Sequence, residues 1–332
     1  MPVGGPAFVI SGILVGLAFG FILQRGRFCV NTGFRDIILL KDFTVFRAYI
    51  LALVVTIIGA NFIEDIGLIT NNSGHLYRQQ FFPVANIVGG YLFGLGIVIA
   101  GGCGSGILYR IGEGLIAALM AVLGFFLAIA TTANGMLRPV NVWLHKVSRV
   151  HYDGQPLTLF GTPDGSITLK WAVIAAISVV FLVFVWKGGP LKFGKQKGFF
   201  WSVAGVLAGI MAVIAFWASD QWGGLARGLS FTGPLKELIF TVTQGDAGGN
   251  NTFSLFGTQI KTTWSAMYVI AVPIGAYLSA RILKEYKLKV PPAEELLAVF
   301  FGGMLMGFGA TVGGGCNIGQ GLTGVSTLAV SS

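Results

Sequence analysis

Three cysteines, Cys29, Cys103 and Cys316, have surroundings that could support chemistry in this chain of 332 residues. Cys103 and Cys316 lie in two apolar, glycine-rich stretches, 89–106 and 302–319, whose patterns are nearly the same. A shift of 213 residues brings seven glycines and the cysteine of the first stretch onto those of the second. Broken helices that are paired across two halves of a membrane protein are typical of transport sites. The repeated pattern therefore predicts a translocation site around these two cysteines.

The glycines beside the two cysteines favour a ligand-binding role over simple packing. A single cysteine in a membrane is most often a small, buried apolar residue. Here Gly-Gly precedes each cysteine, so the backbone can approach a ligand closely. A short helix that starts at this point directs its N–H groups and the positive end of its dipole at the cavity, which suits an anion. The further residues that we expect to line the site are Gly102, Gly104, Ser105, Gly315, Asn317, Gln320 and, near Cys29, Asn31.

The polar members of this set could equally be helix caps. Cys29, which follows the sequence QRGR, could equally be a buried residue at a helix start beside arginines that extend to the surface. A thiol offers a weak S–H donor and a soft, polarizable sulfur, so it suits a ligand that itself carries soft sulfur. An oxyanion without such a sulfur would be bound better by serine or arginine.

The composition defines the class of protein in which these residues lie. Hydrophobic residues make up 54% of the chain and charged residues 11%, and the mean hydropathy is +0.78. Soluble domains carry about 25% charged residues, so the composition predicts a polytopic membrane protein. We expect no nucleic-acid partner, because the net charge of +9 forms no basic stripe with exposed aromatics. We also expect no metal and no cofactor, because the sequence has no CxxC, no zinc spacing and no GxxxxGK[ST] motif.

The apolar runs predict an all-α bundle. The expected spanning helices are 7–24, 43–63, 84–101, 114–132, 169–186, 199–218, 262–283 and 294–311. Shorter stretches, too short to span, are expected as half-helices at 33–41, 104–112, 233–243 and 317–328. Such re-entrant segments are tolerated only where they line a cavity or pack in protein. We assign Gly90, Gly94, Gly303 and Gly307 to close helix packing.

Basic residues give the orientation in the membrane. Segments 25–47, 187–197 and 281–289 are rich in lysine and arginine, and all three share one side if the eight spans alternate. The positive-inside rule makes that side cytoplasmic and puts the N-terminus outside. Loops 64–82, 133–168 and 219–261 then face outward and carry the histidines His75, His145 and His151 in the first two.

The repeat extends beyond the cysteine stretches. Residues 27–33, RFCVNTG, resemble residues 227–233, RGLSFTG, and Ser230 takes roughly the place of Cys29. Four spans lie between the opening helices of the two halves, 7–24 and 199–218, so these two helices cross the membrane in opposite directions and the halves are expected to be inverted. We therefore predict a single transmembrane domain, 1–332, made of two inverted repeats, about 1–132 and 199–332, that an extra helix at 169–186 joins. By analogy with the first half, the repeat predicts a ninth span beyond residue 332 and a cytoplasmic C-terminus.

The segments RGRFCVNTGFRD, GGCGSG and GGGCNIGQGLTG together resemble the YeeE/YedE sulphur-transport family of bacterial inner-membrane proteins, over nearly the whole chain. The resemblance implies thiosulfate uptake and an hourglass form with half-helices meeting at a narrow centre. It implies that Cys29, Cys103 and Cys316 line the route, along which thiosulfate passes by successive S–H···S contacts. It also implies a small TusA-like sulfurtransferase as a cytoplasmic partner. The sequence departs from the family at Asn31, an extra residue where CFTG is commoner.

The function that we expect is uptake of thiosulfate, or of a close sulfur anion, into the cytoplasm, and not an enzymatic reaction. Cys103 and Cys316 would hold the ligand at the constriction, and Cys29 would receive it nearer the cytoplasm. One alternative is a membrane sulfurtransferase that forms a persulfide, which would need a low-pKa thiol with a base nearby. A channel for small neutral solutes is another, and it predicts unchanged flux without Cys103. A structural or assembly subunit is a third, but it would not need polar, glycine-rich breaks.

Overall fold

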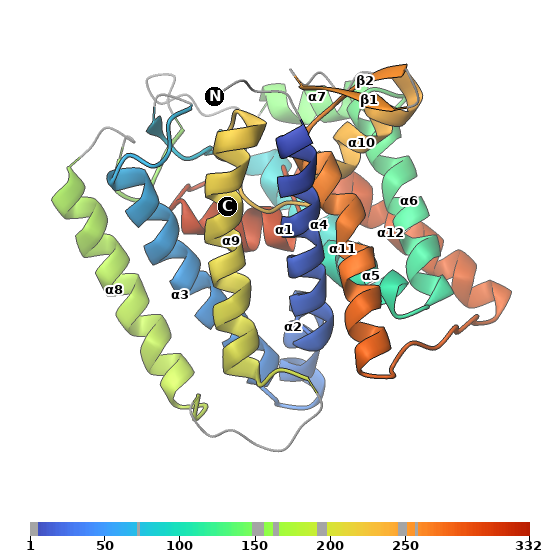
Figure 1. Cartoon of the computed structure of the whole chain (residues 1–332), viewed down its shortest axis with the longest axis horizontal. Coiled ribbons are helices and arrows are strands. Elements are labelled where there is room, and N and C mark those ends of the chain that lie inside the picture. The colour runs from blue at the N-terminus through green and yellow to red at the C-terminus, as the bar shows by residue number, and fades with distance from the viewer. Residues whose placement is uncertain are drawn as a thin grey trace.

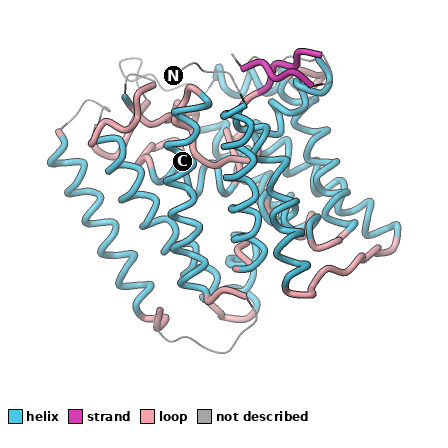
Figure 2. Tube along the Cα trace, in the orientation of Figure 1, coloured by secondary structure: helices cyan, strands magenta, loops and turns pink. Residues whose placement is uncertain are grey.

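A computed structural model describes residues 6–71, 74–147, 156–161, 166–190, 198–244, 251–255 and 258–332. It is a bundle of long helices with several short helices inside it and one β-hairpin at one end (Figures 1 and 2). Eight segments of the described chain are long and apolar enough to cross a membrane. The prediction of an all-α polytopic membrane protein is confirmed.

The eight long helices are α1 (Pro6–Arg25), α3 (Thr44–Asp65), α4 (Pro83–Ile99), α6 (Ile116–Ala133), α8 (Ile167–Trp186), α9 (Trp201–Gly223), α11 (Trp264–Ile282) and α12 (Ala293–Val312). The short helices are α2 (Val30–Leu39), α5 (Gly104–Gly112), α7 (Arg138–Val147), α10 (Thr232–Gln244) and the π-helix η2 (Asn317–Gly324). Strands β1 (Asn251–Leu255) and β2 (Thr258–Thr262) pair antiparallel. Helix α7 and the hairpin lie in segments that the sequence assigns to loops, because neither is long or apolar enough to give a spanning signal.

Glycines allow the long helices to pack backbone to backbone. A Cβ atom on Gly16 of α1 would lie 2.1 Å from the carbonyl oxygen of Tyr268 in α11. In the same way, a Cβ atom on Gly205 of α9 would lie 2.5 Å from the carbonyl oxygen of Ala48 in α3. Close contacts of this kind drive helix association in lipid, where the hydrophobic effect between helices is weak. The packing is therefore reciprocal: α1 packs against α11, and α9 packs against α3.

The packing role is confirmed for Gly303 and Gly307, whose added Cβ atoms would clash with the backbone of α6 at Ala121 and Phe125. It is wrong for Gly90 and Gly94, because a Cβ atom there would meet no atom of the described chain within 4 Å. The close contacts of α4 come instead from Gly89 and Gly96, which pack against α12 and its C-terminal end.

The basic segments that the structure describes lie at one end of the bundle. Arg27 forms an ion pair with Glu285 at 2.8 Å, and the carbonyl oxygen of Arg25 accepts a hydrogen bond from the N–H of Phe199. Helices α7 and α10 and the hairpin lie at the opposite end (Figure 1). Residues 191–197 of the basic segment 187–197, and His151, lie outside the described residues.

A buried network of ion pairs lies at the end of the bundle opposite to the basic segments. Glu64, at the end of α3, accepts two hydrogen bonds of 2.9 Å from Arg78 and one of 2.7 Å from Lys170 of α8. Arg78 also donates from Nε to the carbonyl oxygen of Thr327, just after η2. Each buried charge thus has a partner of opposite sign, as a low-dielectric site demands. The network holds α3, α8 and the segment behind η2 together.

Candidate functional site

Each of the three cysteines is the residue at which a short helix begins. Cys29 precedes α2, Cys103 precedes α5, and Cys316 precedes η2, and all three have extended backbones. Their exposed fractions are 1%, 0% and 2%. Three segments that are far apart in the chain therefore present the same arrangement, a buried thiol at a helix N-terminus.

The turn before Cys103 and the turn before Cys316 both need glycine. Gly101 has φ +69° and Gly314 has φ +86°, which is the left-handed region. A side chain with a Cβ atom is strained there. The two positions are related by the shift of 213 residues that the sequence repeat predicts. Each long helix, α4 or α12, thus ends at such a turn, and a short helix follows it.

The thiols of Cys29 and Cys103 lie in direct contact. Their Sγ atoms are 3.7 Å apart, a distance at which either can donate to the other. The Sγ atom of Cys103 also lies 3.3 Å from the hydroxyl of Ser105. Gly106 makes the approach possible, because a Cβ atom there would lie 2.7 Å from the Sγ atom of Cys29.

Cys316 packs close to Gly104, the residue that follows Cys103. A Cβ atom on Gly104 would lie 4.0 Å from the Sγ atom of Cys316. That Sγ atom accepts a hydrogen bond of 3.4 Å from the N–H of Gly319. The sequence pairs Cys316 with Cys103 at a constriction and puts Cys29 farther along. In the structure the sulfur–sulfur contact joins Cys103 to Cys29, and a single glycine separates Cys103 from the neighbourhood of Cys316.

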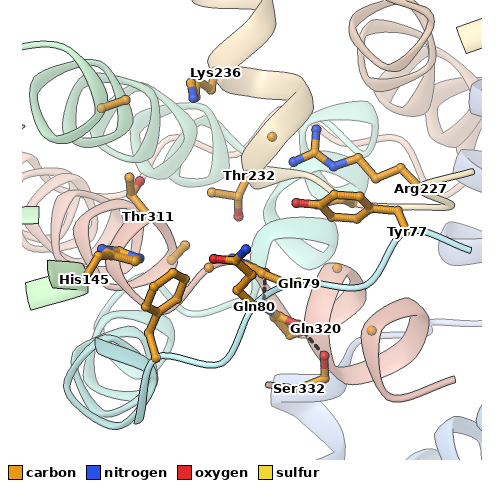
Figure 3. A pocket seen from close by; sticks show the side chains of 18 of the residues that line it. Tyr77, Gln79, Gln80, His145, Arg227, Thr232, Lys236, Thr311, Gln320 and Ser332 are labelled. Carbon is orange, nitrogen blue, oxygen red and sulfur yellow. Dashed lines mark hydrogen bonds between the residues drawn. The ribbon is translucent and has the colours of Figure 1, made fainter. Parts of the chain in front are cut away.

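A cavity of about 820 Å³ opens at the end of the bundle that carries α7 and α10 (Figure 3). We call it the outer cavity. Ser230, Gly319 and Gln320 line it, and Gly319 is the residue that donates to Cys316. Among the described lining residues are Lys146, Lys236 and Arg227, the last paired with Glu237 at 3.1 Å, and no Asp or Glu. The outer cavity is therefore positively charged and extends to the residues that contact Cys316.

A second cavity of about 390 Å³ is lined by Cys316 itself, together with Gly315, Asn317 and Gln320. The Nδ2 atom of Asn317 is buried and has no hydrogen-bond partner in the described part of the chain. A buried amide donor without a partner is rare. The sequence-predicted residues around the second break therefore gather at one cavity.

The other predicted residues have different surroundings. Gln320 lines both cavities, and its Nε2 atom donates to the Oε1 atom of Gln79 at 2.6 Å. Asn31 donates to the carbonyl oxygen of Ile97 at 3.2 Å and so connects α2 to α4. Gly102 lies beside Arg110, whose guanidinium donates to the carbonyl oxygen of Gly101.

Two tyrosines lie at the site that the sequence does not single out. The hydroxyl of Tyr268 accepts a hydrogen bond of 2.6 Å from the N–H of Ser230. A Cβ atom on Gly321 would lie 2.5 Å from the hydroxyl of Tyr49. The sequence signal that could have found them is a tyrosine within an apolar span, because the hydroxyl of a buried tyrosine usually needs a hydrogen-bond partner.

A cluster of polar side chains lies at the basic end of the bundle. Gln24 donates from Nε2 to Glu113 and to Glu285, both at 3.1 Å. Arg27 pairs with the same Glu285 and lies 3.6 Å from Glu113. Within the residues that the structure describes, no group of three or more His, Cys, Asp or Glu side chains could hold a metal ion.

The chain is similar to known proteins over almost its whole length. Residues 25–332 match the family described as Sulphur transport. Thiosulfate transporter TsuA of Spirochaeta thermophila is 34% identical over 332 residues, which cover 97% of this chain and 93% of that protein. Thiosulfate transporter TsuA of Escherichia coli is 31% identical and covers 95% of this chain and 87% of its own length. The probable transporter YedE of Escherichia coli is 31% identical over 102 residues only, 24% of that protein.

Proposed function

The chain belongs to the Sulphur transport family, and on this premise we propose that it is a membrane transporter that takes up thiosulfate. Relatives of 31–34% identity that cover most of the chain are named thiosulfate transporters. The observation that carries the proposal for this chain is the convergence of three thiols. Cys29 and Cys103 lie 3.7 Å apart, and Cys316 lies next to the glycine that follows Cys103.

Thiosulfate has two chemically different ends, an outer sulfur and three oxygens. Neutral thiols can donate weak hydrogen bonds to the outer sulfur, which is soft like their own. Weak contacts suit conduction, because a substrate must bind well enough to enter and loosely enough to leave. Arginine or lysine in the same place would hold the dianion more tightly and slow its release.

The route that we propose begins in the outer cavity, where lysine and arginine side chains draw the anion in. The ligand then meets Cys316, which borders the cavities through Gly319 and Asn317. It passes Gly104 to Cys103 and reaches Cys29, which is already in contact with Cys103. The polar cluster of Gln24, Arg27, Glu113 and Glu285 closes the far end of this route.

We also propose that the two halves are inverted repeats, 1–132 and 199–332, joined by α8. The reciprocal packing of α1 on α11 and α9 on α3 supports this, because each half then uses its first long helix against the second long helix of the other. Inversion accounts for the pair of broken helices meeting from opposite sides. The hourglass form would follow from the same arrangement.

The orientation that we propose puts the basic end in the cytoplasm and the N-terminus outside, in a bacterial inner membrane. Arg25, Arg27, Arg281, Lys284, Lys287 and Lys289 all belong to loops or helix ends at one end of the bundle. This excess is what the positive-inside rule requires of cytoplasmic loops. A topology reporter inserted in the loop 283–292 should be active in the cytoplasm, and periplasmic activity would reverse the orientation.

A small TusA-like sulfurtransferase at the cytoplasmic face would consume the substrate and so maintain the gradient. The basic loops at that end offer a surface for such a partner. Vesicles loaded with a purified sulfurtransferase should accumulate more sulfur from thiosulfate than vesicles without it. Equal accumulation in the two kinds of vesicle would contradict a role for this partner.

The function itself is tested by uptake of labelled thiosulfate into liposomes that contain the purified protein. We expect uptake well above that of empty liposomes and much slower uptake of labelled sulfate, which lacks the outer sulfur. Equal uptake of the two anions would contradict the role of the thiols. Uptake of uncharged solutes instead of thiosulfate would favour a channel, and a stable persulfide on active protein would favour a sulfurtransferase.

A further inference from the structure

The outer cavity contains a polar group that the thiol route does not use, at the N-terminus of α10. Thr232 and Gly233 open this helix of 13 residues, and both line the cavity. Thr232 is only 8% exposed. Its buried Oγ1 atom has no hydrogen-bond partner in the described ranges of the chain. Figure 3 shows the hydroxyl directed toward the middle of the lining side chains. A buried hydroxyl without a partner is costly unless a ligand supplies one.

The backbone at this helix start also has N–H donors that no hydrogen bond among the described residues uses. The N–H of Leu235 bonds to the carbonyl oxygen of Phe231, and Pro234 has no N–H. The first two residues, Thr232 and Gly233, therefore carry the N–H groups that no helical bond uses. Together with the helix dipole, such groups favour an anion.

Two cations lie near the start of α10. Lys236 is one turn after Thr232 and lines the cavity, and its Nζ atom lies 5.9 Å from the centroid of the Phe240 ring. The guanidinium of Arg227 packs against Gly233, with Nη2 at 3.0 Å from the position of an added Cβ atom, and is held by Glu237 at 3.1 Å. His145 and Lys146 of α7 line the cavity as well. The set of donors is of the hard kind, with hydroxyl, backbone N–H and ammonium groups and no thiol.

The geometry points to an oxyanion-holding site at the start of α10, formed by Thr232, the first N–H groups of the helix and Lys236. This inference rests on the proposed function and assigns different groups of the protein to the two ends of thiosulfate. The site binds the oxygens, which thiosulfate and sulfate have in common. The thiols deeper in the protein bind the outer sulfur, which only thiosulfate has. Sulfate should therefore occupy this site and compete with thiosulfate, although it does not pass the cysteines.

Binding is measured first, without transport. Sulfate should raise the melting temperature of the purified wild-type protein above the value in chloride at equal ionic strength, because it binds the folded state. Thr232→Val keeps the side-chain shape and removes the hydroxyl, so most of the rise should be lost. Thr243→Val is the matched control on the same helix, since that hydroxyl donates to the carbonyl oxygen of Ile239 and does not line the cavity. An equal sulfate-dependent rise in Thr232→Val and Thr243→Val would overturn the site.

Transport kinetics then separate the site from the function. Sulfate should raise the apparent KM for thiosulfate and leave kcat unchanged. Lys236→Met should raise that KM about tenfold, the effect of one lost hydrogen bond to a charged group, and Lys236→Arg should restore it. If thiosulfate is taken up but sulfate does not compete, the site is refuted and the transport function stands. If wild-type protein takes up no thiosulfate, the proposed function fails, and the melting-temperature result still decides whether sulfate binds.

Discussion

The two glycine-rich breaks match in sequence, yet the side chain that faces each one differs. A Cβ atom on Gly106 would lie 2.7 Å from the Sγ atom of Cys29, and one on Gly319 would lie 2.6 Å from the Oγ atom of Ser230. Gly106 and Gly319 are related by the shift of 213 residues, and Cys29 and Ser230 by the weaker repeat RFCVNTG and RGLSFTG. One position is thus occupied by a soft sulfur and its counterpart by a hard hydroxyl.

The surroundings of the two cysteines differ in the same sense. The Sγ atom of Cys103 contacts two side chains, Cys29 and Ser105, and is fully buried. Within the described residues, the Sγ atom of Cys316 accepts one hydrogen bond, from a backbone N–H, and Cys316 lines a cavity. The difference teaches that two similar motifs can have unequal tasks. In our account the break at Cys316 receives the ligand from the hydroxyl-lined side, and the break at Cys103 passes it to a second thiol.

The largest expected effect comes from filling the glycine position at each break. Gly106→Ala should abolish thiosulfate uptake, because the new methyl group would overlap the sulfur of Cys29 inside a packed core. Gly319→Ala should reduce uptake less, since the small hydroxyl of Ser230 can rotate away. Uptake by the double variant Gly319→Ala with Ser230→Ala should recover relative to Gly319→Ala alone. Full uptake by Gly106→Ala would show that the route does not pass this point.

The next effect concerns the left-handed turns. Gly101→Ala and Gly314→Ala should each lower the free energy of unfolding by about 1–2 kcal/mol through backbone strain. Gly314→Ala should cost more, because its methyl group would also lie 2.3 Å from the side-chain amide of Gln79. Melting temperatures of the purified variants measure the difference. Adding Gln79→Ala should remove the extra loss of stability caused by Gly314→Ala. If the melting temperature does not recover, the clash with the Gln79 amide is not the cause of the extra loss.

A smaller effect is expected from exchanging sulfur and oxygen between the two facing positions. Cys29→Ser should lower thiosulfate uptake severalfold, since a hydroxyl is a poorer partner for the outer sulfur. Ser230→Cys should leave uptake within about twofold of wild type. The new thiol keeps a hydrogen-bond donor on a side that contacts the oxygens of thiosulfate as well as its outer sulfur. A larger loss from Ser230→Cys than from Cys29→Ser would reverse the assignment of soft and hard sides.

Among the variants at the Cys103 break, the smallest effect should come from Ser105, whose counterpart in the second break is the apolar Ile318. Its hydroxyl contacts the Sγ atom of Cys103 at 3.3 Å. Ser105→Ala should reduce uptake only about threefold, as expected for one neutral hydrogen bond of roughly 0.5–1.5 kcal/mol. Initial uptake rates at several substrate concentrations would show this loss, and an effect as large as that of Gly106→Ala would make Ser105 a principal ligand.

The sequence predicts the spans and the breaks well because both depend on local composition. Apolar runs mark the eight long helices, and the paired glycines mark the breaks at which Gly101 and Gly314 have positive φ. The contact between Cys29 and Cys103 was not predictable in the same way. It depends on how α1, α6 and α11 pack around α5, and no local pattern records that distance. Helix α7 was missed because it is short and amphipathic, and Thr232 because an unpaired hydroxyl is visible only in three dimensions.

The central claim is that three thiols line one route. Initial rates of labelled thiosulfate uptake by Cys103→Ala, Cys316→Ala and Cys29→Ala, in liposomes with equal amounts of folded protein, test it most directly. The account predicts near-complete loss for the first two variants and a milder loss for Cys29→Ala. Wild-type rates in all three variants would contradict it.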